Sequence, residues 1–293
     1  MKYIHVNLKR FDIQRALGGV NDYALSEKKD WAQSIMVQLN ATINQFSSLD
    51  YQFVFYLPEA YILTAQAAKS VQSPIKIGCQ SVFRHDTFED GNIGAYTTMR
   101  PASAMTGLGV HDTIIGHSEE RAAKLNFLRQ VSADDDKNLQ AIHDDLQAGI
   151  QMAQHANMRV LYCVGESAAV RDDGSWKDVI KAQLNFDSDK INLHNLKIAY
   201  EPIWAIGPNR PVPDGNAIEA VAAYIHELIG ADIPILYGGG LKETNAQEIA
   251  GLPDIDGGLI ALTNFSERIG FYPDQFIDIA KKYASGVASH EKI

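Results

Sequence analysis

Eight short apolar runs alternate with longer segments along the chain, and this alternation constrains the fold more than any other feature of the sequence. The runs cover residues 3–6, 53–57, 74–79, 112–115, 159–163, 196–200, 234–237 and 256–262. Short runs that are mainly apolar are typical of strands buried on both faces. Between and after them, the sequence predicts helices at residues 25–46, 59–71, 101–108, 133–155, 176–185, 214–229, 243–250 and 273–283.

Strands that alternate regularly with helices predict a parallel α/β fold, and eight such units indicate a closed (β/α)8 barrel. No internal repeat, low-complexity segment or linker divides the sequence, and barrels of this kind commonly reach this length as one unit. We therefore expect residues 1–293 to form a single domain. The C-terminal ends of all the strands of such a barrel lie on one face, where its active site is built.

The stretch IAYEPIWAIGPNRPVP, residues 198–213, is the strongest candidate for the chemistry on that face. Glu201 follows the strand directly, and Pro202 ends the strand because it has no N–H to donate. An apolar patch comes next, followed by Gly207 and Pro208. This order suits a general base covered by a closing lid. An isolated Glu-Pro pair is more often a plain turn, so the interpretation depends on what else converges there.

Two other strand ends carry polar side chains of the right kind. Asn7 and Lys9 follow the run 3–6, and His117 follows the run 112–115 where a helix is expected to begin. The positive end of a helix favours a neutral imidazole, which can donate a hydrogen bond to a carbonyl oxygen. Taken alone, His117 is better explained as a simple helix start. In a barrel, however, Lys9, His117, Glu201 and the glycine turn 238–240 meet on one face.

Composition excludes several other classes of function. The net charge of −10 and pI of about 5.3 argue against a broad basic surface for nucleic acid or an anionic membrane. No apolar run is long enough to span a bilayer, and residues 1–10 lack the apolar core of a secretory signal, so we expect a cytoplasmic protein. Cys79 and Cys163 lie in apolar runs, as buried reduced thiols do, and without CxxC or HExxH spacing we expect no metal site.

The sequence resembles the triosephosphate isomerase family, and the resemblance covers nearly the whole chain. Four runs carry it in the family's order: IIGHSEER at 114–121, CVGE at 163–166, AYEPIWAIG at 199–207 and LYGGGLKETN at 236–245. The resemblance implies a TIM barrel that interconverts glyceraldehyde 3-phosphate and dihydroxyacetone phosphate through an enediolate. It also implies a homodimer with a small phosphorylated sugar as substrate, no cofactor, and a place in glycolysis and gluconeogenesis.

Residue roles are carried over from the family rather than worked out from spacing. Glu201 would be the base, His117 the electrophile and Lys9 the positive charge, with Asn7 beside Lys9 and Glu119 supporting His117. The positions that would contact the substrate phosphate are Gly207, Gly239, Gly240, Ala261 and Leu262.

The departures from the family surround the phosphate. Gly240 stands where the family usually has Ser, and Ala261 and Leu262 stand where it has a Gly-Gly pair. The lid reads AIGPNRP instead of AIGTGKT, Glu120 replaces an Arg, and the loop usually ending TGE ends TTM at 97–99. Three hypotheses therefore stay open: a triose phosphate isomerase, an isomerase of another small ketose phosphate such as erythrulose phosphate, and a non-catalytic barrel.

Overall fold

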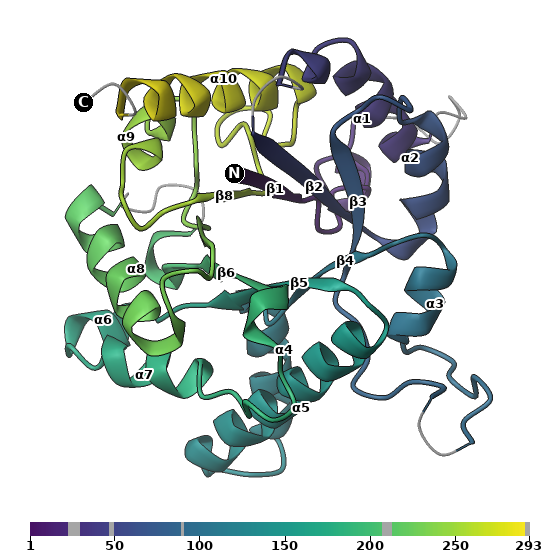
Figure 1. The fold of residues 1–293 in the computed structure, drawn as a ribbon. Helices are drawn as coiled ribbons and strands as arrows, with labels where there is room; N and C mark the ends of the chain where they lie inside the picture. The colour runs from purple at the N-terminus through teal and green to yellow at the C-terminus, as the bar shows by residue number, and fades with distance from the viewer. Residues whose placement is uncertain (23–29, 47–49, 89–90, 207–212, 291–293) are drawn as a thin grey trace.

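Eight parallel strands close into a barrel in the order of the chain, with each strand hydrogen-bonded to the next and β8 to β1. The computed structural model describes residues 1–22, 30–46, 50–88, 91–206 and 213–290. Figure 1 shows the strands as an inner ring with the helices around it. The strands are β1 (Lys2–Asn7), β2 (Tyr51–Leu57), β3 (Ile75–Gln80), β4 (Asp112–Ile115), β5 (Arg159–Val164), β6 (Leu196–Tyr200), β7 (Ile235–Tyr237) and β8 (Gly257–Ile260). The predicted (β/α)8 barrel is thus confirmed.

The helices follow the expected order, with some different ends, but the short helix Ala168–Asp172 was not predicted from the sequence. They are α1 (Trp31–Asn40), α2 (Ile62–Ala68), α3 (Ala102–Gly107), α4 (Ser118–Leu128), α5 (Asp135–His155), α6 (Ala168–Asp172), α7 (Trp176–Gln183), α8 (Gly215–Ile229), α9 (Ala246–Ala250) and α10 (Pro273–His290). Of the helix expected at 25–46, residues 25–29 lie outside the described part of the chain. α1 begins at Trp31, where Asp30 caps it by accepting from the backbone N–H of Gln33 at 2.9 Å, and it ends at Asn40, before a separate 3₁₀ turn, Ile43–Phe46. None of the helices in this described part of the chain is long and apolar enough to cross a lipid bilayer.

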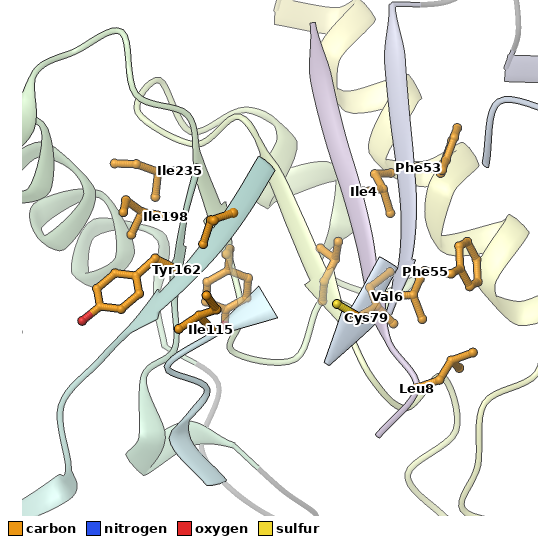
Figure 2. Packing of buried hydrophobic residues seen from close by; sticks show 14 of the residues in the cluster. Ile4, Val6, Leu8, Phe53, Phe55, Cys79, Ile115, Tyr162, Ile198 and Ile235 are labelled. Atoms are coloured by element: carbon orange, nitrogen blue, oxygen red, sulfur yellow. The ribbon is translucent and has the colours of Figure 1, made fainter. Parts of the chain in front are cut away.

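Alternate residues of the strands fill two separate apolar layers. Ile4 and Val6 of β1 and Phe53 and Phe55 of β2 are buried in the layer between the strands and the helices (Figure 2). Residues at the intervening positions, such as Val54 and Tyr56, belong to a smaller cluster inside the barrel. Because both faces of each strand are covered, the strands read as continuous apolar runs, which is why the sequence predicted them well.

Candidate active site

Three polar side chains from distant parts of the chain line one cavity of about 410 Å³. Lys9 follows β1, His117 follows β4 and Glu201 follows β6. Asn7, Glu119 and the glycine turn 238–240 after β7 also line this cavity. Parallel strands in a closed barrel all end on one face, so the fold brings together residues that are far apart in sequence.

The Glu201 carboxylate is almost fully buried, with 3% of the residue exposed, and both of its oxygens have donors. Oε1 lies 2.9 Å from His117 Nε2, and Oε2 accepts a 2.9 Å hydrogen bond from the backbone N–H of Ser118. The backbone N–H of Glu201 donates to the carbonyl of Val164 at 2.7 Å, which continues the sheet pairing past β6. Gly165 is required beside it, because a Cβ there would overlap the carbonyl oxygen of Glu201. The carboxylate is therefore held in one place by the His117 ring and by main-chain contacts.

His117 occupies the position immediately before α4, and its ring caps that helix. Its Nδ1 accepts a 3.2 Å hydrogen bond from the backbone N–H of Glu119. A nitrogen that accepts a hydrogen bond carries no proton, so the pattern assigns a neutral ring with its proton on Nε2. This Nε2–H points at Glu201 Oε1. From the same position it can donate a hydrogen bond to a substrate oxygen.

Lys9 is held over the cavity by contacts at both ends of the residue. Its backbone has a φ of +44°, in the left-handed region, and its N–H donates to Asn7 Oδ1 at 3.0 Å. Its ammonium lies 2.6 Å from Glu119 Oε1. Partial burial alone would raise the pKa of Glu119, but the hydrogen bond and charge of Lys9 outweigh it and lower that pKa. The Glu119 carboxylate therefore stays charged beside Lys9.

Gln80 at the end of β3 contributes a role that the sequence analysis did not assign. Its side-chain Nε2 donates to the carbonyl of Lys9 at 2.9 Å and lies 3.2 Å from Asn7 Oδ1. It thereby fixes the unusual backbone that carries Lys9. The only signal in the sequence was its place in the run GCQ, which resembles the family but does not reveal what the amide binds.

The expected phosphate positions fall into two groups. Gly239, Gly240, Ala261 and Leu262 line the same cavity as Glu201, and Gly240 has a φ of +92°. Gly207, together with Pro208 and Asn209 of the lid, lies outside the described residues. The structure thus brings four of the five expected positions to the cavity.

The start of the lid is anchored to a buried carboxylate, Glu166, whose role the sequence analysis also missed. Glu166 Oε1 accepts from Trp204 Nε1 at 2.8 Å and from the Tyr200 hydroxyl at 2.9 Å. Trp204 belongs to a 3₁₀ turn, Ile203–Ala205, directly after the strand that positions Glu201. The lid and the base are consequently linked through one short segment.

Glu120, which replaces an expected Arg, forms hydrogen bonds with nearby groups of two loops. Its Oε2 accepts from the backbone N–H of Gly116 at 2.8 Å, and its Oε1 accepts from the Ser81 hydroxyl at 3.1 Å. The side chain therefore ties the end of β4 to the segment after β3.

Comparison with known proteins points to one family. The family model described as Triosephosphate isomerase matches residues 24–282. A triosephosphate isomerase from Alkalilimnicola ehrlichii is 32% identical over 76% of this chain and 82% of its own length, and one from Halorhodospira halophila is 33% identical over 77% and 84%. One from Nostoc sp. is 34% identical over 64% of this chain and 69% of its own length. With a barrel that carries these side chains on one face and a match over most of its length, this chain belongs to the triosephosphate isomerase family.

Proposed function

We propose that this chain is an isomerase that interconverts glyceraldehyde 3-phosphate and dihydroxyacetone phosphate by proton transfer. The observation that carries the proposal is the contact between a buried carboxylate, Glu201, and a neutral imidazole, His117, inside one cavity. Proton abstraction next to a carbonyl requires a base, a donor to the carbonyl oxygen, and exclusion of water. The relatives reported above are named for this reaction.

Each residue has a defined task in the proposed reaction. Glu201 removes a proton from the carbon next to the carbonyl, and an enediolate forms. The Nε2–H of His117 donates a hydrogen bond to the substrate oxygen, and the Lys9 ammonium offsets the negative charge that develops there. The hydroxyl proton passes through His117 Nε2 from one substrate oxygen to the other, and Glu201 returns the carbon-bound proton to the neighbouring carbon, so no electron acceptor or donor is consumed.

The contacts of Glu201 also define what must change when a substrate binds. Its two oxygens accept from His117 and from the backbone of Ser118. A carboxylate in these two contacts has to release His117 before it can reach a carbon-bound proton. Substrate binding and repositioning of the base are therefore one step in this proposal, and the segment Ile203–Ala205 that follows Glu201 moves with it.

A triose phosphate is favoured over a tetrulose phosphate because the relatives carry the triosephosphate isomerase name over most of this chain. A non-catalytic barrel would have no reason to keep a buried base in contact with a neutral imidazole. Ala261 and Leu262 line the cavity where the family has glycines, so a comparison of substrates of different length tests this choice.

A coupled assay of the purified protein tests the proposal directly. We expect turnover of glyceraldehyde 3-phosphate to exceed that of erythrulose phosphate and other tetrulose phosphates at equal concentration. Phosphoglycolate, which imitates the enediolate and its phosphate, should inhibit competitively. A higher kcat/KM with a tetrulose phosphate would show that the tetrulose phosphate is the preferred substrate. A folded protein that is inactive on every sugar phosphate tested would end the proposal.

We also propose a homodimer, an expectation that began with the family resemblance. The segment between β3 and α3 extends away from the barrel in Figure 1, and it exposes large apolar side chains, including 95% of Ile93. A second cavity of about 610 Å³ opens beside Lys9 and Gln80 and offers a concave surface to a neighbouring copy. Light scattering on the eluting protein should give twice the monomer mass, and a monomer at micromolar concentration would contradict it.

A cytoplasmic location stays a prediction from the sequence, to be tested by fractionation.

A further inference from the structure

Lys242 is a charged side chain in the cavity to which neither the sequence analysis nor the proposed reaction assigns a task. It follows the turn 238–240 after β7, and it lines the same cavity as Glu201 and His117. Two lysines of the described residues line that cavity, Lys9 and Lys242. Lys9 is paired with Glu119, whereas the described residues include no carboxylate paired with Lys242. A partly buried ammonium without an anion is well placed to receive one from a ligand.

The side chain of Lys242 folds back over the turn that precedes it. Its Cε lies 3.8 Å from the point where a Cβ at residue 240 would stand. Gly240 has no side chain to donate from, and Ala261 and Leu262, which line the same cavity, offer no polar side-chain atom. Lys242 therefore supplies a hydrogen-bond donor in the space that Gly240 leaves empty.

Two contacts hold Lys242 in this place. Its Nζ lies 4.3 Å from the centre of the Phe265 ring, which also lines the cavity. Its backbone N–H donates to Asn245 Oδ1 at 2.7 Å, and the amide of Asn245 donates in turn to the carbonyl of Gly240 at 3.2 Å. The aromatic face attracts the ammonium without neutralising it, and Asn245 fixes the turn, so the charge stays available to a ligand.

We propose that Lys242 binds the phosphate of the substrate. Its ammonium provides the side-chain hydrogen-bond donor that Gly240, Ala261 and Leu262 lack. The inference rests on the proposed function for the identity of the substrate, but the anion site itself does not depend on turnover. Lys242 is a binding residue in this proposal and takes no part in proton transfer. Its effect should therefore appear in KM and in the binding of inorganic phosphate, with kcat nearly unchanged.

Lys242→Met tests the proposal because it removes the charge and keeps most of the length of the side chain. Loss of a charge-assisted hydrogen bond should weaken binding of inorganic phosphate, measured by calorimetry, by about tenfold or more, and should raise KM for glyceraldehyde 3-phosphate similarly. Lys242→Arg should recover most of both. Phe265→Leu should weaken phosphate binding by less than Lys242→Met, since the charge remains.

Lys177→Met is a matched control, because Lys177 also lies over aromatic rings, those of Trp176 and Tyr224, but on the outer helix α7. It should leave phosphate affinity unchanged. With unphosphorylated glyceraldehyde as substrate, Lys242→Met should lower kcat/KM by a much smaller factor than with glyceraldehyde 3-phosphate. Equal phosphate affinity of wild type and Lys242→Met would overturn the proposal, and so would a wild type that binds no phosphate. A wild type that binds phosphate through Lys242 but does not isomerise trioses would leave the anion site standing and refute the proposed function instead.

Discussion

His117 Nε2 and Glu201 Oε1 lie 2.9 Å apart, so the donor to the substrate oxygen and the base are in direct contact. Each is held from behind by main-chain groups of the same short segment: His117 Nδ1 accepts from the N–H of Glu119, and Glu201 Oε2 accepts from the N–H of Ser118. The first turn of α4 therefore sets the position of both groups. We therefore expect the reaction rate to depend strongly on small displacements of either group, even in variants that keep its chemical type.

Glu201→Asp tests this dependence on position. The shorter side chain keeps the charge but withdraws the carboxylate by about 1 Å, and such misplacement costs roughly 100-fold in rate. We expect kcat to fall by at least that factor with little change in melting temperature, as measured by the coupled assay and thermal denaturation. Glu227→Asp, on the exposed face of α8, is the control. Unchanged turnover in Glu201→Asp would remove Glu201 from the mechanism.

Glu119→Gln separates the side chain of Glu119 from its backbone. The backbone N–H of Glu119 that donates to His117 Nδ1 remains, but the charge that holds the Lys9 ammonium at 2.6 Å is lost. We expect kcat/KM to fall by about tenfold, because Lys9 no longer has one fixed position. Since the pKa of Glu119 is lowered, the wild-type pair should persist as the pH falls through the usual range of a Glu carboxyl. Wild-type activity in Glu119→Gln would show that Lys9 is positioned by its backbone alone.

The strands could be predicted from the sequence because strands that are buried on both faces consist mainly of apolar residues. Helix ends were less predictable, since they depend on single side chains. Asn245 Oδ1 accepts from the N–H of Lys242 and stabilises a turn there, so the helix expected from residue 243 begins at Ala246. At the other end of the chain, α10 continues to His290, past the expected end at 283.

The candidate site could be predicted where strand ends determine it and not where side-chain direction does. Lys9, His117 and Glu201 each follow a strand, so the barrel topology alone brings them together. Gln80 and Glu166 act through contacts with residues from other strands, which no local pattern records. Lys242 was missed because its direction depends on the absence of a side chain at Gly240 and on the ring of Phe265.

The double substitution Ala261→Gly and Leu262→Gly tests whether these side chains limit access of a phosphate to the backbone. Both residues follow β8 and line the cavity. Removing them exposes backbone N–H groups, so we expect KM for glyceraldehyde 3-phosphate to fall severalfold. The added backbone freedom should cost roughly 1–2 kcal/mol of stability for the two positions together. A KM that stays the same or rises would mean that these side chains do not obstruct the phosphate.

His5 should make the protein less stable in mild acid. The residue is buried inside the barrel beside Tyr56, and burial, followed by the nearby charges of Lys197, Lys76 and Arg159, holds its pKa well below the usual value. The unfolded chain takes up this proton near pH 6.5 and the folded chain does not, so stability falls as the pH drops below that value. The contribution reaches at most about 1.4 kcal/mol per pH unit. His5→Gln should lose less stability than the wild type between pH 7 and pH 5, measured by urea denaturation, and parallel losses would contradict this account.

The last prediction concerns an ion pair at the N-terminal end of the barrel. It states which of the two residues, Asp112 or Arg159, costs more stability when it is removed. Arg159 Nε donates to Asp112 Oδ1 at 2.8 Å, and the carboxylate is buried while the guanidinium side chain is 40% exposed. The pKa of Lys197 and that of Lys76 are both lowered, first by burial and also by the charge of Arg159, whereas Asp112 acts in the opposite direction on both. Asp112 therefore balances three cations, and Arg159 is only one of them.

Asp112→Asn should accordingly destabilise the protein more than Arg159→Met. We expect a loss of roughly 2–3 kcal/mol at pH 7, below the range for a fully buried pair because the guanidinium is partly exposed. In Arg159→Met the carboxylate still has Lys76 and Lys197 nearby, so the loss should be smaller. A lysine whose folded pKa is lowered gives up its proton more readily in the folded chain than in the unfolded one, so stability rises as the pH increases toward the usual lysine value. Asp112→Asn should thus recover part of its lost stability between pH 7 and pH 9.5, relative to the wild type in urea denaturation. Equal losses in the two variants, with no recovery at high pH, would show that Asp112 serves Arg159 alone.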